Sequence, residues 1–167
     1  MQSREGHTYI NQYRVLAKRY PMLDTRIILL DLIEDSANPG EWFAAARAAG
    51  HLDIALTCAL NGHVNPGTLA NAAEDTILLA PEFSFAIALR ALHLFLDGYG
   101  FENSRTEMLK AADAMIGAYY ALNDPPYCLE QVQTLVLRVK GSKDLLAELL
   151  LSHLGRDWPG LTWKSRL

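Results

Sequence analysis

The chain has 167 residues, half of them hydrophobic and one-fifth charged, which is typical of one globular domain with a single core. Its formal net charge of −4 gives no general attraction to nucleic acid, whose binding requires a concentrated basic surface. Only two cysteines are present, far apart at Cys58 and Cys128, so no disulfide framework is expected.

No stretch of the sequence approaches the roughly 20 apolar residues of a membrane span, and the first residues lack the apolar core of a signal peptide. We therefore expect a cytoplasmic protein with no membrane partner.

Apolar residues recur at helical spacing along the chain, and no segment alternates with the period of a strand. Pro, Gly and capping residues mark the ends of the predicted helices. In chain order these span about residues 8–19, 24–35, 39–50, 51–61, 65–80, 82–97, 104–122, 127–141 and 142–154.

One helix start occurs twice, 27 residues apart, as Asn38-Pro39-Gly40 and Asn65-Pro66-Gly67. Asn can cap a helix, and Pro fits the first turn because its missing N–H costs nothing there. Repeated starts of this kind are typical of stacked helical hairpins.

Glycine and capping residues predict how individual helices end and begin. Gly50 is expected to end the third helix in a left-handed conformation, which makes the third and fourth helices antiparallel. Ser104 and Glu107 have capping-box spacing, and Ser142 is expected to cap the last helix. Trp42, Phe43 and Ala46 should then pack against Ile54, Ala55 and Ala59.

These features predict an all-α fold: a single domain over residues 1–167 with about eight or nine helices in stacked antiparallel hairpins. The hairpins would form either an α-solenoid or a compact bundle. Residues 156–167 are expected to be an irregular tail.

The segments Gly40 to Ala46, Ala49 to Leu56 and Asp97 to Glu102 combine small residues with glycine turns. In this they resemble tetratricopeptide-type helical hairpins, and the region from Pro39 to Glu102 is similar to helical segments of uncharacterised bacterial proteins. The resemblance implies stacked hairpins, although the period of 27 residues is shorter than the tetratricopeptide period of 34. It implies no functional residue.

Metal and nucleophile patterns are missing from the sequence. None of the five histidines has the spacing of a zinc site, and Asp53 suits a helix N-terminus better than a metal. Cys58 is expected to be an inert core thiol. Cys128 lies in the first turn of a predicted helix, where the dipole could lower its pKa, but no base is identifiable beside it. We expect no metal and no cofactor.

Three polar residues share one stripe of the very apolar sixth helix: Arg90, His93 and Asp97. They could form the wall of a polar pocket, with a contact between His93 and Asp97. The simpler interpretation, which we favour, is that they form the solvated edge of a buried helix.

Charged residues also gather on the first two predicted helices. Asp24, Asp31, Glu34 and Asp35 form an acidic stripe, which Lys18 and Arg19 or another protein could neutralise, although we favour a solvated helix surface as its explanation. The basic residues form three small sets, at Arg14, Lys18 and Arg19, at Arg138, Lys140 and Lys143, and at Lys164 and Arg166.

The tail contains two tryptophans, Trp158 and Trp163, which are costly to leave in water. They either fold back onto the domain, as we expect, or bind a partner. For that reason both are candidate binding residues.

The sequence therefore favours a non-catalytic interaction module, a scaffold or adaptor that binds a protein or peptide in a groove between helices. The alternative is a small helical enzyme or ligand-binding domain that uses Arg90, His93 and Asp97. A homodimer that buries the apolar second and sixth helices also remains open. No nucleic-acid partner is expected.

Overall fold

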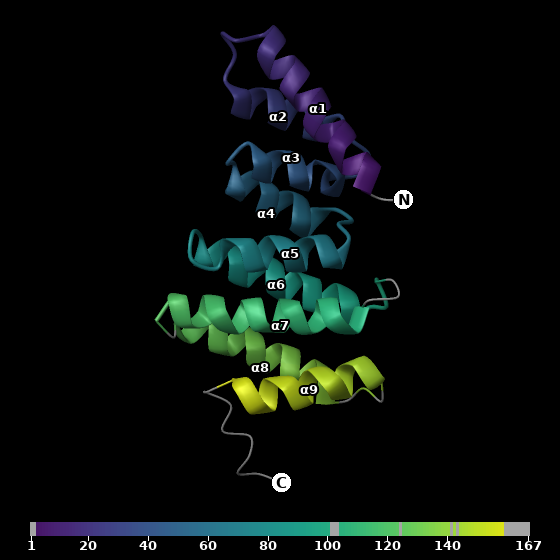
Figure 1. The fold of residues 1–167 in the computed structure, drawn as a ribbon, viewed down its shortest axis with the longest axis vertical. Helices are drawn as coiled ribbons and strands as arrows, with labels where there is room; N and C mark the ends of the chain where they lie inside the picture. Colours follow the sequence, from purple (N-terminus) through teal and green to yellow (C-terminus); the bar gives the residue numbers. More distant parts are fainter. Residues whose placement is uncertain (1–2, 101–103, 124, 141, 143, 159–167) are drawn as a thin grey trace. The chain divides into compact units, whose positions relative to one another are not determined.

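A computed structural model describes residues 3–100, 104–123, 125–140, 142 and 144–158. Within them the chain forms nine α-helices and one 3-10 helix and has no strand, which confirms the all-α prediction (Figure 1). In chain order these are α1 (Ser3–Arg19), α2 (Thr25–Glu34), η1 (Pro39–Trp42), α3 (Phe43–Ala48), α4 (Leu52–Asn61), α5 (Pro66–Thr76), α6 (Pro81–Leu96), α7 (Ser104–Ala121), α8 (Pro126–Lys140) and α9 (Leu145–Asp157).

The predicted helix ends differ from the observed ones mainly at three helices: α1, α5, which ends at Thr76 rather than near residue 80, and α9. Helix α1 begins at Ser3 rather than near residue 8. Helix α9 continues to Asp157, so the prediction that residues 156 and 157 are irregular is wrong. The last helix is capped by Asp144, whose side chain accepts a hydrogen bond from the backbone N–H of Leu146, and not by Ser142.

The helices form two compact units, Met1–Val64 and Asn65–Leu167, which we describe separately as unit 1 and unit 2. Within the described residues, no helix is both long and apolar enough to cross a bilayer.

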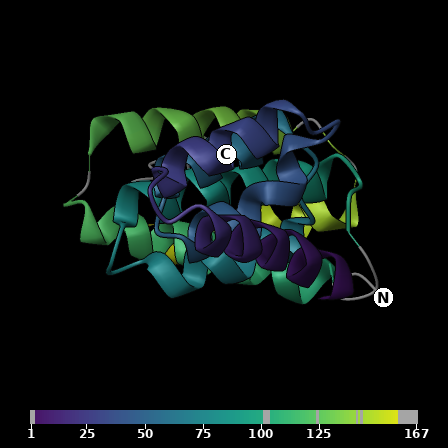
Figure 2. The ribbon, with the colours of Figure 1, turned by 90° about the horizontal axis from the view of Figure 1, so that it is seen from above.

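Unit 1 begins with a hairpin of α1 and α2, joined by the turn at residues 20–24 (Figure 2). Asp24 caps α2, because its carboxylate accepts a 2.8 Å hydrogen bond from the backbone N–H of Arg26. Helices α3 and α4 form a second hairpin, and the six residues predicted to pack there are all buried.

The turn between α3 and α4 is the left-handed glycine that the sequence predicts. Gly50 has a φ of 82°, a conformation that costs other residues free energy. The N–H of His51 donates to the carbonyl of Ala46, and that of Gly50 donates to Arg47, which is the Schellman arrangement. Gly98, with a φ of 85°, ends α6 in the same way.

The two Asn-Pro-Gly segments both begin helices, but the first also ties two segments together. Asn38 Oδ1 accepts hydrogen bonds from the N–H of Gly40 and of His63, and its Nδ2 donates to the His63 carbonyl. Asn65 caps its own helix α5, through the N–H groups of Gly67 and Thr68. The first copy starts as a 3-10 helix and the second as an α-helix.

Unit 2 is built around α5, α6 and α7, which pack tightly on one another, and α9 packs on α7 and α8. Small residues of α5 allow this close approach, since Ala70, Ala72 and Ala73 are completely buried. Ser84 is buried as well, and its hydroxyl donates a 2.7 Å hydrogen bond to the Ala73 carbonyl. The largest completely buried side chains of this unit are Phe85, Phe95, Leu69, Ile87, Leu92, Met108, Met115, Leu135, Leu150 and Leu154.

Candidate functional site

A pocket of about 370 Å³ lies between α5 and α7 of unit 2. Its volume falls within the range of pockets that hold a small ligand or a few side chains. Ile77, Leu109 and the buried Ala114 supply apolar surface. The polar lining residues are Glu74, Thr106, Lys110 and Asp113.

The helical period explains why α7 supplies most of this lining. Residues 106, 109, 110, 113 and 114 are spaced by three or four, so they share one face of α7. From α5 and the turn that follows it come Glu74 and Ile77.

The polar side chains of the pocket are held by neighbouring helices. Lys110 Nζ lies 3.2 Å from a Glu74 carboxylate oxygen and 3.0 Å from Asn71 Oδ1. Asp113 Oδ1 lies 2.6 Å from Nε2 of His153 on α9, and Arg156 contacts the other ring nitrogen of His153. The pocket therefore has an apolar wall and fixed groups of both charges, an arrangement that can bind an apolar side chain flanked by polar groups.

The stripe predicted on α6 contacts Arg138 of α8, a contact that the sequence analysis did not predict. One guanidinium nitrogen of Arg138 lies 2.7 Å from His93 Nδ1, and another donates to Asp97 Oδ1. Arg90 contributes positive charge near His93. His93, Asp97 and Arg138 thus form a polar cluster between α6 and α8. In this cluster Asp97 and Arg138 are exposed and His93 is half-buried.

Burial lowers the pKa of His93 below its ordinary value of 6.5, and the positive charge of Arg138 lowers it further. Asp97 acts in the opposite direction, but more weakly. The ring is therefore neutral at physiological pH, with Nδ1 accepting the hydrogen bond from Arg138 and the proton assigned to Nε2. A ligand-binding role for Arg90, His93 and Asp97 stays a hypothesis.

Of the two tryptophans in the predicted tail, the structure describes only Trp158. Trp158 is 4% exposed, and its ring lies 4.5 Å, centroid to centroid, from that of Tyr119 on α7. It therefore contributes to the core of unit 2. Trp163 lies outside the described residues.

Both cysteines are free, buried thiols. Burial raises the pKa of Cys58 to about 11, as expected for an inert core thiol. It also raises the pKa of Cys128, so the idea that the helix start lowers this pKa is wrong. Among the described residues, no group of three or more His, Cys, Asp or Glu side chains could hold a metal ion.

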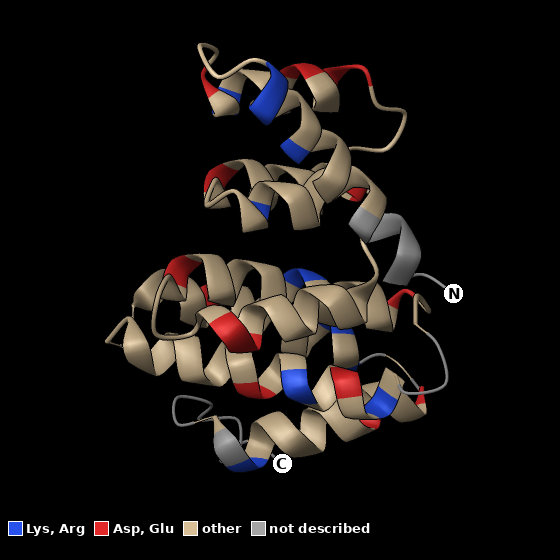
Figure 3. Ribbon diagram, turned by 45° about the horizontal axis from the view of Figure 1, so that its top comes forward, with Lys and Arg blue, Asp and Glu red and all other residues tan. Residues whose placement is uncertain are grey.

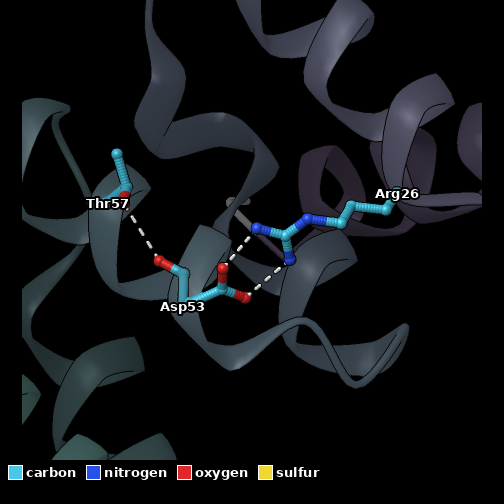
Figure 4. A network of polar contacts seen from close by, with 3 residues as sticks. All are labelled: Arg26, Asp53 and Thr57. Atoms are coloured by element: carbon cyan, nitrogen blue, oxygen red, sulfur yellow. Dashed lines mark hydrogen bonds and ion pairs between the residues drawn. The ribbon is translucent and has the colours of Figure 1, made fainter.

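In unit 1, Arg26 of α2 and Asp53 of α4 form an ion pair that joins two hairpins (Figure 4). The two guanidinium nitrogens lie 3.0 and 2.5 Å from the two carboxylate oxygens. The hydrogen bond from Arg26 lowers the pKa of Asp53 to about 2. The sequence predicted only a helix-start role for Asp53, because nothing local indicates a partner 27 residues away.

The acidic stripe and the first basic set both lie on the surface of unit 1. Asp24 serves its own helix as a cap. Among the described residues, no ion pair reaches Asp31, Glu34 or Asp35, and Lys18 and Arg19 form none either. The structure therefore shows no direct ion pair between Lys18 or Arg19 and this stripe in the described residues.

Comparison with known proteins gives no match to a family model, to a curated protein or to a solved structure. The tetratricopeptide-like resemblance stays a prediction from the sequence.

The sequence analysis missed the pocket between α5 and α7. One signal was available, because Thr106, Lys110 and Asp113 recur on one face of a predicted helix. Their partners Glu74 and His153 lie 36 and 40 residues from Lys110 and Asp113, so only the packing of α5, α7 and α9 reveals them.

Proposed function

We propose that the chain is a non-catalytic interaction module, a scaffold or adaptor that binds a short peptide segment of another protein in the pocket between α5 and α7. The observation that carries the proposal is the pocket itself, in which an apolar wall lies beside charged groups of both signs that neighbouring helices hold in place. Such a site accepts one apolar anchor and positions the polar backbone around it.

The surroundings of the pocket support a peptide rather than a small metabolite. Leu78 and Leu79, which follow the lining residue Ile77, are among the most exposed large apolar side chains of the described residues. An extended peptide that leaves the pocket along this turn would cover them, whereas a small ligand would not. Two free buried thiols support the reducing cytoplasm as its location.

Selection from a random peptide library tests the proposal directly. Peptides are selected on the wild-type chain displayed through its C-terminus, and their affinity is measured by fluorescence anisotropy. Thr106→Trp places a large ring in the pocket from an exposed position, and should weaken binding of the selected peptides at least about tenfold.

The matched control is Thr134→Trp, the same change at an exposed position on α8. This variant should bind the peptides within about twofold of the wild type. Selection that enriches no peptide, or peptides that bind both variants equally, would contradict the proposal.

A further inference from the structure

Exposed large apolar side chains gather on the α1–α2 hairpin, beside its charged residues. Six large apolar side chains within residues 15–30 are exposed, including Met22 at 94%, Val15 at 63%, Ile27 at 52% and Leu30 at 45%. Ile27 and Leu30 are three residues apart on α2, so they form one outward stripe, and Met22 and Leu23 extend it into the turn. Apolar surface gathered in this way on one element marks a contact surface.

Charges of opposite sign lie on the two helices of the same hairpin. Residues 8–23 contain no acid, and they carry the exposed bases Arg14, Lys18 and Arg19. Helix α2 and its C-cap carry the exposed acids Asp31, Glu34 and Asp35. Figure 3 shows this division, with Lys and Arg in blue on α1 and Asp and Glu in red on α2.

Within the part of the chain that the structure describes, these charges form no ion pairs, although the guanidinium of Arg19 lies 5.8 Å from the ring centroid of Tyr20. The single arginine of α2, Arg26, is already bound to Asp53. Apart from the exposed N-cap Asp24, the hairpin therefore presents three bases beside three acids, with exposed apolar residues on both helices.

We propose that a second copy of this chain binds here, through a twofold-symmetric contact in which α1 of each copy lies against α2 of the other. An isologous interface must be self-complementary, and a hairpin with one basic and one acidic helix meets that condition. The opposite register, α1 on α1 and α2 on α2, would place like charges together.

Other occupants fit this surface less well. A basic partner bound to the acids of α2 would be repelled by the bases of α1. An acidic partner bound to the bases of α1 would be repelled by the acids of α2. Helix α6, the other very apolar helix of the chain, is covered by helices of its own unit. The dimer does not depend on the pocket between α5 and α7.

The size of the hairpin limits the affinity. Helix α2 has 10 residues, so at 1.5 Å per residue it is about 15 Å long. A contact of two short helices is smaller than a standard stable interface, and we expect a dissociation constant of about 1 to 100 μM.

Exchange of the charges between two chains tests both the dimer and its register. In one chain the bases are reversed by Lys18→Glu with Arg19→Glu, and in the other the acids are reversed by Asp31→Lys with Glu34→Lys. Each variant alone should dimerise at least about tenfold more weakly than wild type, because like charges meet at both contacts. An equimolar mixture should recover a heterodimer, since α1 and α2 of the two chains are then opposite in charge.

Analytical ultracentrifugation from about 1 to 500 μM measures the wild type and each variant, and native mass spectrometry identifies the mixed species. As a control, Glu82→Lys with Glu130→Lys in unit 2 changes the net charge as much as Asp31→Lys with Glu34→Lys does. This control should leave the dimer unaffected. Circular dichroism checks that every variant keeps its helices.

Ile27→Ser with Leu30→Ser removes the apolar stripe without changing charge and should also weaken the dimer at least about tenfold, while Leu137→Ser on α8 should not. A wild-type chain that stays monomeric throughout the range would overturn the proposal. A dimer whose affinity is unchanged in all of these hairpin variants would also overturn it. A chain that stays monomeric and binds a basic peptide on α2 would overturn it as well.

Discussion

At the scale of single residues, the cluster of His93, Asp97 and Arg138 shows how burial and a charged neighbour together set the protonation state of a histidine. Arg138 donates a hydrogen bond to Nδ1 of His93. Protonation of Nδ1 would remove this acceptor and place a positive charge beside the guanidinium of Arg138. Half-burial of the ring disfavours the charged form even more strongly. The cluster is therefore built for the neutral ring.

Arg138→Gln should raise the pKa of His93 toward its ordinary value of 6.5, because it removes the positive charge beside Nδ1. A titration followed by NMR of the histidine ring protons measures this pKa, and His93→Asn identifies the His93 signal among those of the other histidines. An unchanged pKa in Arg138→Gln would show that burial alone lowers it.

The same shift makes folding stability depend on pH. The folded-state pKa of His93 lies below the unfolded value, so the unfolded chain binds more protons as the pH falls through about 6.5. The contribution of neutral His93 is complete above this pH and is lost as the pH falls toward the folded-state pKa. Urea denaturation at several pH values measures the free energy of unfolding of wild type and Arg138→Gln. As the pH falls below about 6.5, this free energy should decrease less in the variant than in wild type.

At the scale of helices and turns, the repeated Asn-Pro-Gly start has a structural meaning that the sequence only partly predicts. In both copies the glycine is a point of close approach. A Cβ on Gly40 would clash with the backbone of His63, and one on Gly67 would lie 2.5 Å from a Glu107 carboxylate oxygen. The repeat therefore combines a helix cap with a site where another segment packs.

The two glycines should respond differently to the same substitution. Gly40→Ala meets fixed backbone and should cost about 3 kcal/mol in the free energy of unfolding, whereas Gly67→Ala meets the mobile end of Glu107 and should change it by less than about 1 kcal/mol. Urea denaturation, monitored by circular dichroism, compares the two variants with the wild type. Equal losses would show that the close approach at Gly40 is not rigid.

Local chemistry explains why the sequence predicts helix starts and ends better than contacts. The left-handed Gly50, the caps at Asn38 and Asn65, and the helix order depend on residues within a few positions of one another. The contacts that define the candidate sites do not, since His93 and Arg138 are 45 residues apart. Such pairs depend on how the fold brings the side chains of α6 and α8 together, which periodicity alone does not give.

The same limit applies where local signals compete. Asp144 caps α9 rather than Ser142, although both residue types suit the position and lie two residues apart. The sequence also predicted one continuous helix from Pro39, but its first turn is a 3-10 helix. At that turn Asn38 also bonds the N–H and carbonyl of His63, a tertiary contact that a local pattern does not contain.

At the scale of the whole molecule, each unit contains its own buried core. In unit 2, residues of α5 such as Leu69 and Ala73 are completely buried, as are Leu92 on α6 and Met115 on α7. In unit 1 the core includes Leu29 on α2 and Phe43 on α3. The prediction of a single domain over residues 1–167 can therefore be tested by asking whether one unit folds without the other.

We expect the fragment 65–167 to fold alone, because α5, α6 and α7 bury one another within it. Its far-ultraviolet circular dichroism per residue should match that of a helical protein, and its urea denaturation should be cooperative. The fragment 81–167 is the control, since it lacks α5 and exposes the faces of α6 and α7 that α5 covers. This shorter fragment should lose cooperative unfolding. If 65–167 is as poorly folded as 81–167, the chain folds as one domain, because unit 2 then depends on unit 1 for a stable core.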